Sequence, residues 1–289
     1  MPTPSKQCLS SELLVNVPVN RELFRLDFEW SGPAPRAGQF FMVKSEGSSL
    51  FLARPISVAL WQLAAKPEDI DPRKHRRRSP EEQKWFTSNT IRFIIARRGK
   101  GTAELAEMRV GERAELSGPL GNAWGDFAVE GKRPIALIGG GIGVAPLGAF
   151  AVELEECIGD QRSFDFYAGF RTRHKTAEER YGLLVAAVYS AKELIIATED
   201  GSEGKKGRIP DFLDPAQYKA VYACGPEVML KAVTARCRSA HVPCFISMER
   251  RMACGVGACL GCTVKTVHGN RRCCADGPIF NGEEVLFDE

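Results

Sequence analysis

The sequence predicts a multidomain fold in which an antiparallel β-barrel is followed by a doubly wound α/β domain and a small cysteine-rich C-terminal domain. Three observations predict it. Short β-rich runs broken by turn residues fill residues 13–127, an apolar strand leading into a glycine turn and a helix begins near residue 134, and five cysteines crowd the segment after residue 250. A length of 289 residues also exceeds one typical core.

The barrel is predicted over residues 8–129 by alternating apolar and polar residues. Residues 22–28 and 90–95 show the two-residue period of strands that bury one face. A polar insertion at residues 61–89 interrupts this pattern and contains the basic run 73–78, which acidic residues flank on both sides. We interpret the insertion as a solvated hairpin extension rather than a docking patch, and assign it no function.

The α/β domain is predicted over residues 130–244 and the cysteine-rich domain over residues 245–289. Residues 135–138 form a continuous apolar run, as expected for a parallel strand buried on both faces, and a glycine turn and a helix from Ala145 to about Cys157 follow. Further strands are expected at residues 164–168, 193–197 and 220–223, and further helices at residues 177–190 and 227–240.

Composition and charge predict a soluble protein that binds neither nucleic acid nor a membrane. The net charge is only +3, and the contents of 26% charged and 44% hydrophobic residues are ordinary for a globular chain. The N-terminal residues lack the apolar core of a secretory signal, and no stretch approaches the roughly 18 apolar residues of a membrane span. We therefore expect a cytoplasmic protein, in which clustered cysteines more often bind metal than form disulfides.

The cysteines near the C-terminus predict an iron–sulfur site. The spacing Cys254-x4-Cys259-x2-Cys262, with a further cysteine about a dozen residues later, matches plant-type [2Fe-2S] proteins. Cys273 and Cys274 compete for the fourth position, and spacing does not choose between them. A structural zinc is the alternative, although zinc sites usually show two paired halves. A Rieske centre would need two histidine ligands, and this segment has one histidine.

Two strand-to-helix turns predict a nucleotide site. The motif Gly141-x-Gly143-x-x-Pro146 follows an apolar strand, and such a turn presents backbone N–H groups and a helix N-terminus to a pyrophosphate. The run Cys224-Gly225-Pro226 ends a later strand in the same way. Either turn alone also fits an ordinary tight turn. Two of them at the carboxyl edge of one sheet predict a dinucleotide site.

The barrel contains a third candidate site. Arg54 can pair with a phosphate, Ser57 can hydrogen-bond the edge of an isoalloxazine ring, and the turn at Gly101-Thr102 can donate N–H groups to a pyrophosphate. Taken alone, the run Arg-Pro-x-Ser also fits an ordinary strand start. The interpretation of this run as a flavin site therefore depends on the other motifs in the sequence.

The order and spacing of these motifs resemble the ferredoxin-NADP reductase superfamily. The cysteine loop and the run from Cys274 to Phe280 narrow the resemblance to the family of electron-transfer subunits of NAD-dependent, class 1B dihydroorotate dehydrogenases. The resemblance extends from about Leu13 to Phe280 and includes residues 198–202. The insertion at residues 61–89 departs from the compact subunit typical of that family.

The resemblance implies an FAD-binding barrel, an NAD-binding α/β domain and a [2Fe-2S] domain. It implies that electrons run from a separate FMN-containing catalytic subunit, in a heterotetramer, through the cluster and FAD to NAD+ in pyrimidine biosynthesis, with no dihydroorotate site and no catalytic side chain in this chain. It favours Cys274 as the fourth ligand. The implied site residues are Arg54, Pro55, Ile56, Ser57, Gly101 and Thr102 for FAD, Gly141, Gly143, Pro146, Cys224, Gly225 and Pro226 for NAD(H), and Cys254, Cys259, Cys262 and Cys274 for iron.

Two other functions are consistent with the sequence. The same cofactors would serve a reductase subunit of a hydrogenase, a bifurcating transhydrogenase or a glutamate synthase-like protein. A zinc-stabilised interaction module without flavin is the non-enzymatic alternative. Arg171 and Arg173, which follow the second α/β strand, could contact a 2′-phosphate, so the preference for NAD over NADP rests on the resemblance.

Overall fold

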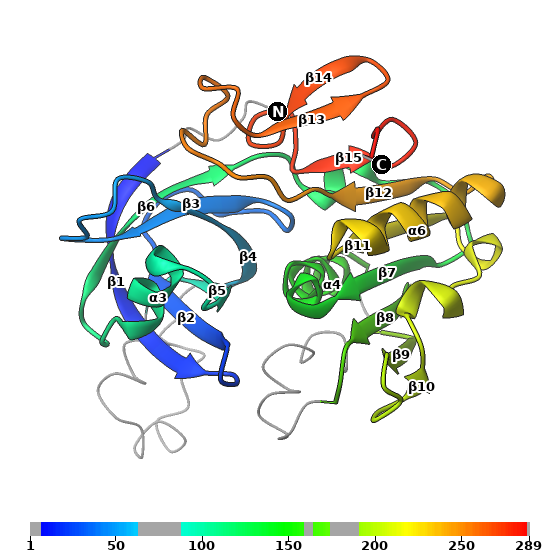
Figure 1. Cartoon of the computed structure of the whole chain (residues 1–289), viewed down its shortest axis with the longest axis horizontal. Helices are drawn as coiled ribbons and strands as arrows, with labels where there is room; N and C mark the ends of the chain where they lie inside the picture. Colours follow the sequence, from blue (N-terminus) through cyan, green and yellow to red (C-terminus); the bar gives the residue numbers. More distant parts are fainter. Residues whose placement is uncertain (1–6, 63–87, 159–163, 174–190, 288–289) are drawn as a thin grey trace. The chain divides into compact units, whose positions relative to one another are not determined.

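The computed structural model describes residues 7–62, 88–158, 164–173 and 191–287 (Figure 1). Two compact units make up the chain, one comprising Met1–Arg36 with Phe40–Pro119 and the other Ala37–Gln39 with Leu120–Glu289. The predicted helix at 177–190 and the basic run at 73–78 lie outside the described residues. No helix within the described residues is long and apolar enough to span a membrane.

The first unit is a closed antiparallel barrel with the strand order β1-β2-β5-β4-β3-β6, as the alternating pattern predicts. Leu26 and Phe28 of β2 and Ile91 and Phe93 of β5 belong to its buried core, which the helix α3 also joins. The helix spans Lys100–Glu107, and the strands are β1 (Gln7–Pro18), β2 (Leu23–Glu29), β3 (Phe40–Ser45), β4 (Arg54–Gln62), β5 (Thr90–Ala96) and β6 (Arg113–Leu120).

The face of β2 opposite the apolar core carries a buried carboxylate. Asp27 is only 1% exposed and binds Arg25, on the same strand, and Arg92, its cross-strand neighbour on β5. Arg92 Nε and Nη2 donate to the carboxylate at 2.9 and 3.0 Å, and Arg25 Nε donates at 3.0 and 3.1 Å. Burial acts to raise the pKa of Asp27, but the two arginines outweigh it and lower the pKa below its ordinary value of 3.8.

Replacing Asp27 with asparagine is expected to lower the free energy of unfolding by about 3 kcal/mol at neutral pH, because it removes a buried negative charge that pairs with two partly buried guanidinium groups. The pKa of Asp27 is lower in the folded chain than in the unfolded chain, so its contribution is complete above pH 3.8 and is lost as the pH falls through the folded-state value. Denaturant unfolding of both proteins between pH 7 and pH 3 measures this, and the difference between them should shrink in acid.

A matched control for Asp27→Asn is Glu107→Gln. Glu107 pairs with Arg97, but the two side chains are 62% and 47% exposed, so the loss is expected to stay below about 0.5 kcal/mol. Equal losses from the two substitutions would contradict a special role for the buried carboxylate.

The second unit contains a sheet with the order β10-β9-β8-β7-β11-β12-β15. Adjacent strands from β10 to β12 run parallel, and all residues of β7 are buried, as its apolar run predicts. The strand order reverses between β7 and β11, which makes this pair the topological switch point. The elements are β7 (Ile135–Gly140), α4 (Val144–Ile158), β8 (Phe164–Phe170), β9 (Glu193–Thr198), β10 (Lys205–Lys206), β11 (Ala220–Cys224), α6 (Glu227–Ser239) and β12 (Cys244–Ser247).

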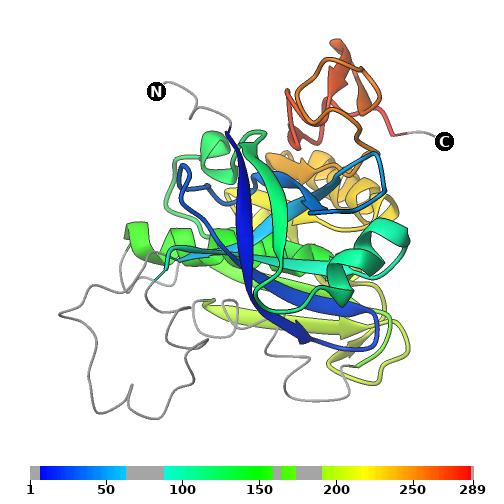
Figure 2. The same cartoon turned by 90° about the vertical axis from the view of Figure 1, so that its left-hand side faces the viewer.

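The chain leaves this sheet after β12 and later returns to it (Figure 2). It forms the cysteine loop, then the hairpin of β13 (Thr263–Thr266) and β14 (Gly269–Arg272), and comes back as β15 (Ile279–Asn281), antiparallel to β12. The last described residues hold the hairpin, because Val267 N donates to Glu284 O and Leu286 N to Lys265 O, each at 2.9 Å.

The boundary between the first two predicted domains differs from the boundary between the units. The predicted barrel extends to residue 129, whereas Leu120 and the residues after it belong to the second unit. Hydrogen bonds and ring packing explain the difference. Asn122 binds the segment 276–279, and Trp124 packs against Phe150 and Tyr222. These contacts join residues far apart in the sequence, so no local pattern predicts them.

Candidate functional site

Both predicted glycine turns lie at the carboxyl edge of the sheet, on the two strands that flank the switch point. β7 runs into a turn of 3-10 helix at Gly141–Gly143 and then into α4, and β11 ends at Cys224, which Gly225-Pro226 and α6 follow. Ligands of doubly wound sheets bind in this position, where strand ends and helix N-termini meet. Pro146 lies in the first turn of α4, where its missing N–H costs no helical hydrogen bond.

The two turns approach each other so closely that only glycine fits between them. A Cβ atom at Gly143 would lie 2.3 Å from Cys224 O and 2.8 Å from Gly225 N. Both are backbone atoms, which cannot move aside as a flexible side chain can. Burial raises the pKa of the Cys224 thiol to about 12, so this side chain is protonated and uncharged at neutral pH.

The barrel places Arg54 of β4 over the start of α3. A Cβ atom at Gly101 would lie 2.3 Å from Arg54 Nε and 2.7 Å from its Cζ, so the guanidinium covers the first turn of the helix. Arg54 Nη1 also donates to Leu52 O at 2.8 Å and Ala53 O at 3.3 Å, which fixes the side chain. A fixed cation beside the N–H groups of a helix start is suited to a phosphate.

The other predicted barrel residues shape this region. Thr102 Oγ1 accepts hydrogen bonds from Arg98 N and Gly99 N at 3.0 and 3.2 Å and donates one to Gly99 O at 3.1 Å, so its hydroxyl closes the turn before α3. Ile56 packs partly against the barrel core. The half-buried residues that continue β4 after Arg54 are Pro55, Ile56 and Ser57.

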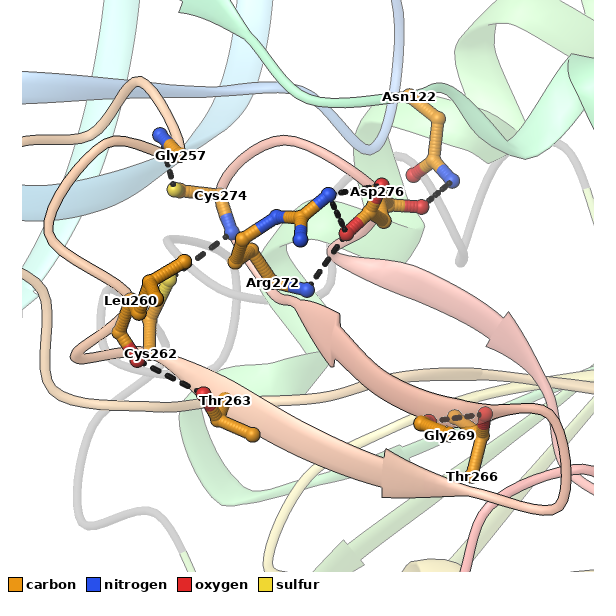
Figure 3. A network of polar contacts seen from close by, with 10 residues as sticks. All are labelled: Asn122, Gly257, Leu260, Cys262, Thr263, Thr266, Gly269, Arg272, Cys274 and Asp276. Carbon is orange, nitrogen blue, oxygen red and sulfur yellow. Dashed lines mark hydrogen bonds and ion pairs between the residues drawn. The ribbon is translucent and has the colours of Figure 1, made fainter.

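The cysteine loop directs backbone N–H groups at its own sulfur atoms (Figure 3). Cys254 Sγ accepts hydrogen bonds from the N–H groups of Val256 and Cys259, at 3.5 and 3.4 Å. Gly257, whose φ of +84° favours glycine, donates to Cys274 Sγ at 3.1 Å, and Cys274 N donates to Cys262 Sγ at 3.4 Å. Hydrogen bonds of this kind stabilise thiolates and tune the metals that thiolates bind.

The structure distinguishes Cys273 from Cys274, the two candidates for the fourth ligand between which the spacing does not choose. Cys274 Sγ accepts the N–H of Gly257 and lies beside Cys262. Cys273 Sγ is fully buried and donates to Met248 O at 3.0 Å. A thiol that donates to a carbonyl keeps its proton, whereas an iron ligand must lose it. The geometry therefore favours Cys274 over Cys273.

The four predicted ligands form two neighbouring pairs, Cys254 with Cys259 and Cys262 with Cys274. Among the described residues, no three His, Cys, Asp or Glu side chains are arranged to hold a single metal ion. Two pairs suit a [2Fe-2S] cluster, in which each iron takes two protein ligands. Four sulfurs with N–H donors directed at three of them thus fit such a cluster.

The thiols differ in their protonation without a metal. The N–H groups of Val256 and Cys259 lower the pKa of Cys254 to about 6. Burial and the neighbouring Cys262 raise the pKa of Cys274 to about 12. A coordinating metal ion would deprotonate both thiols.

Two polar links near the cysteine loop were not predicted from the sequence. Arg250, before the loop, donates to Glu227 in the first turn of α6, with 2.7 Å between Nη1 and Oε2. Asn122 exchanges hydrogen bonds with Ile279, at 2.9 and 3.0 Å, and its backbone N donates to Gly277 O at 2.7 Å. A lone asparagine after glycine is typical of an ordinary turn, so the sequence gave no signal for this link.

Comparison with known proteins gives matches to the C-terminal segment and to nearly the whole chain. Residues 249–286 match the family model for the iron–sulfur cluster binding domain of dihydroorotate dehydrogenase B. The chain is 37% identical over 276 residues to the dihydroorotate dehydrogenase B (NAD(+)) electron transfer subunit of Clostridium acetobutylicum, covering 95% of both proteins. It is 39% identical over 251 residues to that of Clostridium perfringens, covering 87% of both.

Solved structures show the same fold. An NADH-dependent reduced ferredoxin-NADP oxidoreductase, described for flavin-based electron bifurcation, superposes with a TM-score of 0.73 at 26% identity, over 96% of this chain and 89% of that one. The ferredoxin reductase of carbazole 1,9a-dioxygenase superposes with a TM-score of 0.61 at 20% identity, over 84% and 68% of the two chains. The second likeness bears on the fold alone.

Proposed function

Since the chain belongs to the family of dihydroorotate dehydrogenase B electron transfer subunits, we propose which of its residues hold each electron carrier. It is an NAD-linked oxidoreductase subunit of pyrimidine biosynthesis that uses FAD and a [2Fe-2S] cluster. Because a flavin exchanges hydrides with nicotinamide and single electrons with iron–sulfur clusters, FAD supplies the conversion between the two. The observation that carries the assignment of residues is the set of backbone N–H groups directed at the sulfur atoms of Cys254, Cys262 and Cys274.

The cysteine loop would hold the cluster. Cys254 and Cys259 would bind one iron, and Cys262 and Cys274 the other. The N–H donors to Cys254, Cys262 and Cys274 would stabilise negative charge on the sulfurs and so raise the reduction potential.

The barrel would hold FAD. Arg54 would neutralise a phosphate that also receives N–H groups from the start of α3, at Gly101 and Thr102. Ile56 would face the ring system with an apolar side chain, and Ser57 would offer its hydroxyl to the ring edge. Pro55 keeps the strand extended between Arg54 and these two residues.

Alanine at Gly101 is expected to weaken FAD binding by roughly tenfold to a hundredfold, because its Cβ would displace the Arg54 guanidinium from the helix start. The matched control is Gly99→Ala, since a Cβ at Gly99 meets nothing within 4 Å and its φ of −152° suits any residue. Flavin fluorescence during titration of the flavin-free protein measures both affinities. Equal FAD affinity in the two variants would contradict the placement of the phosphate.

The carboxyl edge of the α/β sheet would hold NAD(H). The N–H groups of the Gly141–Gly143 turn and the N-terminus of α4 would bind the pyrophosphate, with Pro146 closing the first helical turn. The turn Cys224-Gly225-Pro226 would border the nicotinamide half, where the protonated thiol of Cys224 adds no charge.

The partner is a catalytic subunit of dihydroorotate dehydrogenase B, as the relatives' description as electron transfer subunits implies. We propose that this partner carries FMN, that the complex is a heterotetramer, and that it is cytoplasmic. Exposed apolar side chains around the cysteine loop support docking there, because Val256 and Leu260 are 51% and 61% exposed. A cluster near the docking face would shorten the path of the electrons.

An anaerobic visible spectrum of the purified chain, with iron and flavin measured before and after addition of NADH, tests the proposal. We expect one flavin and about two irons per chain, with absorption that bleaches on NADH. A colourless, zinc-containing protein would refute it. The chain is then combined with a dihydroorotate-oxidising subunit, and NAD+ reduction by dihydroorotate is measured. Only a dihydroorotate dehydrogenase subunit should support this reaction, whereas a reductase subunit of another complex should not.

A further inference from the structure

Cys273 and Cys274 stand on a single tight turn. Figure 3 shows Cys274 and the Asp276 side chain that braces this turn. Ala275 N and Asp276 N both donate to Arg272 O, at 3.1 and 2.8 Å. The Asp276 carboxylate returns to the start of the turn, where Oδ2 accepts from Arg272 N at 2.6 Å and the guanidinium lies 3.0 Å away. One side chain thus ties both ends of the turn that carries Cys273 and Cys274.

The turn presents its two thiols to different partners. Cys274 Sγ receives the N–H of Gly257, whereas Cys273 Sγ donates to Met248 O. Both thiols are buried and both are chemically able to bind iron, so their chemistry does not decide which one does. Because the two residues are adjacent on one turn, the direction in which the backbone points each side chain decides which sulfur reaches the cysteine loop. The selection must therefore come from what fixes the backbone.

A second contact fixes the turn from outside. Asn122 Nδ2 donates to Asp276 O at 3.3 Å, and Asn122 N donates to Gly277 O at 2.7 Å. Arg272, held by Asp276, also lies beside the loop that faces the thiol, since a Cβ at Gly257 would lie 3.9 Å from its Nε. Loss of the carboxylate would free the turn and this cation together.

We propose that Asp276 is a positioning residue that presents Cys274, and not Cys273, to the iron–sulfur cluster. This inference rests on the proposed assignment of the cluster to the cysteine loop. Without the carboxylate the turn can rotate, and the Cys273 thiolate can replace the Cys274 thiolate on iron. The exchange transfers no electron, and the proton released by one thiol is taken up by the other.

The test compares electron paramagnetic resonance spectra and midpoint potentials of the reduced cluster in four proteins. The wild type and Cys273→Ser should give the same single signal at the same potential. Asp276→Ala should give two signals at different potentials. The second signal should be absent from the double variant Asp276→Ala/Cys273→Ser, because only Cys273 can produce it.

Several outcomes would overturn the inference. A wild-type spectrum and potential in Asp276→Ala would show that the carboxylate does not select the ligand. A second signal that persists in the double variant would exclude Cys273 as its source. If Asp276→Ala takes up no cluster, Asp276→Asn replaces it in the comparison, because asparagine keeps an oxygen for Arg272 N but loses the ion pair with the Arg272 guanidinium, and it should give the same second signal. Loss of iron from both, with FAD retained, would also contradict the inference, because Cys273 would then have failed to substitute.

The experiment distinguishes this failure from that of the proposed function. A wild-type chain that holds no iron would refute the assignment of the cluster itself. A normal wild-type cluster with an unchanged Asp276→Ala spectrum would refute only the role of Asp276.

Discussion

Replacing Cys274 with serine is expected to remove the iron–sulfur cluster from a chain that still folds and still binds FAD. A hydroxyl is a much harder ligand than a thiolate and keeps its proton far more readily, and the Cys274 side chain that it would replace is buried. We expect the iron content to fall at least about tenfold and electron delivery between NADH and the partner subunit to fall about a hundredfold. Metal analysis and paramagnetic resonance measure the first, and coupled assays with the partner measure the second.

Cys273→Ser is the control for this substitution. The sulfur of Cys274, and not that of Cys273, contacts the cysteine loop through Gly257 N. A serine at position 273 can donate to Met248 O as the Cys273 thiol does. We expect normal iron content and a loss in the free energy of unfolding of no more than about 1 kcal/mol. The reverse result, with iron lost from Cys273→Ser and retained in Cys274→Ser, would exchange the assignments of the two cysteines.

Alanine at Gly143 is expected to abolish fast reduction of the flavin by NADH. The new Cβ would lie 2.3 Å from Cys224 O, so the turns after β7 and β11 must move apart. A displacement of about 1 Å at the reacting geometry can cost about a hundredfold in rate. Stopped-flow measurement of flavin bleaching at several NADH concentrations separates weaker binding from slower hydride transfer.

The Gly143→Ala protein carries its own control. Gly143 lies outside the barrel unit and outside the cysteine loop, so FAD and iron contents should equal those of the wild type. Chemical reduction by dithionite should bleach both chromophores normally. Wild-type bleaching by NADH would show that the dinucleotide does not depend on the close approach of the two turns.

Local patterns were sufficient to predict most of the described fold. The two-residue period of β2 and β5 predicts the barrel because each strand buries one face against a shared core. The unbroken apolar run of β7 predicts a parallel strand because both faces of that strand are covered. The cysteine spacing predicts the metal loop because the ligands lie close together in the sequence.

The remaining features depend on contacts between distant residues. Asn122 joins the second unit through hydrogen bonds to residues about 155 positions away, and no pattern around it indicates this. The choice between Cys273 and Cys274 follows from the direction of each side chain on a turn, which spacing does not contain. The family resemblance favours the same cysteine that the geometry favours.

The return of the chain as β15 has a consequence for attempts to shorten the protein. β15 is the outermost strand on its side of the sheet and covers the open edge of β12, with Phe280 opposite Ile246 and both side chains buried. A fragment ending before the cysteine loop would expose the backbone N–H and C=O groups of β12 and an apolar strip beside them. Such edges recruit strands from other molecules, so the fragment should self-associate rather than survive as a minimal flavin reductase.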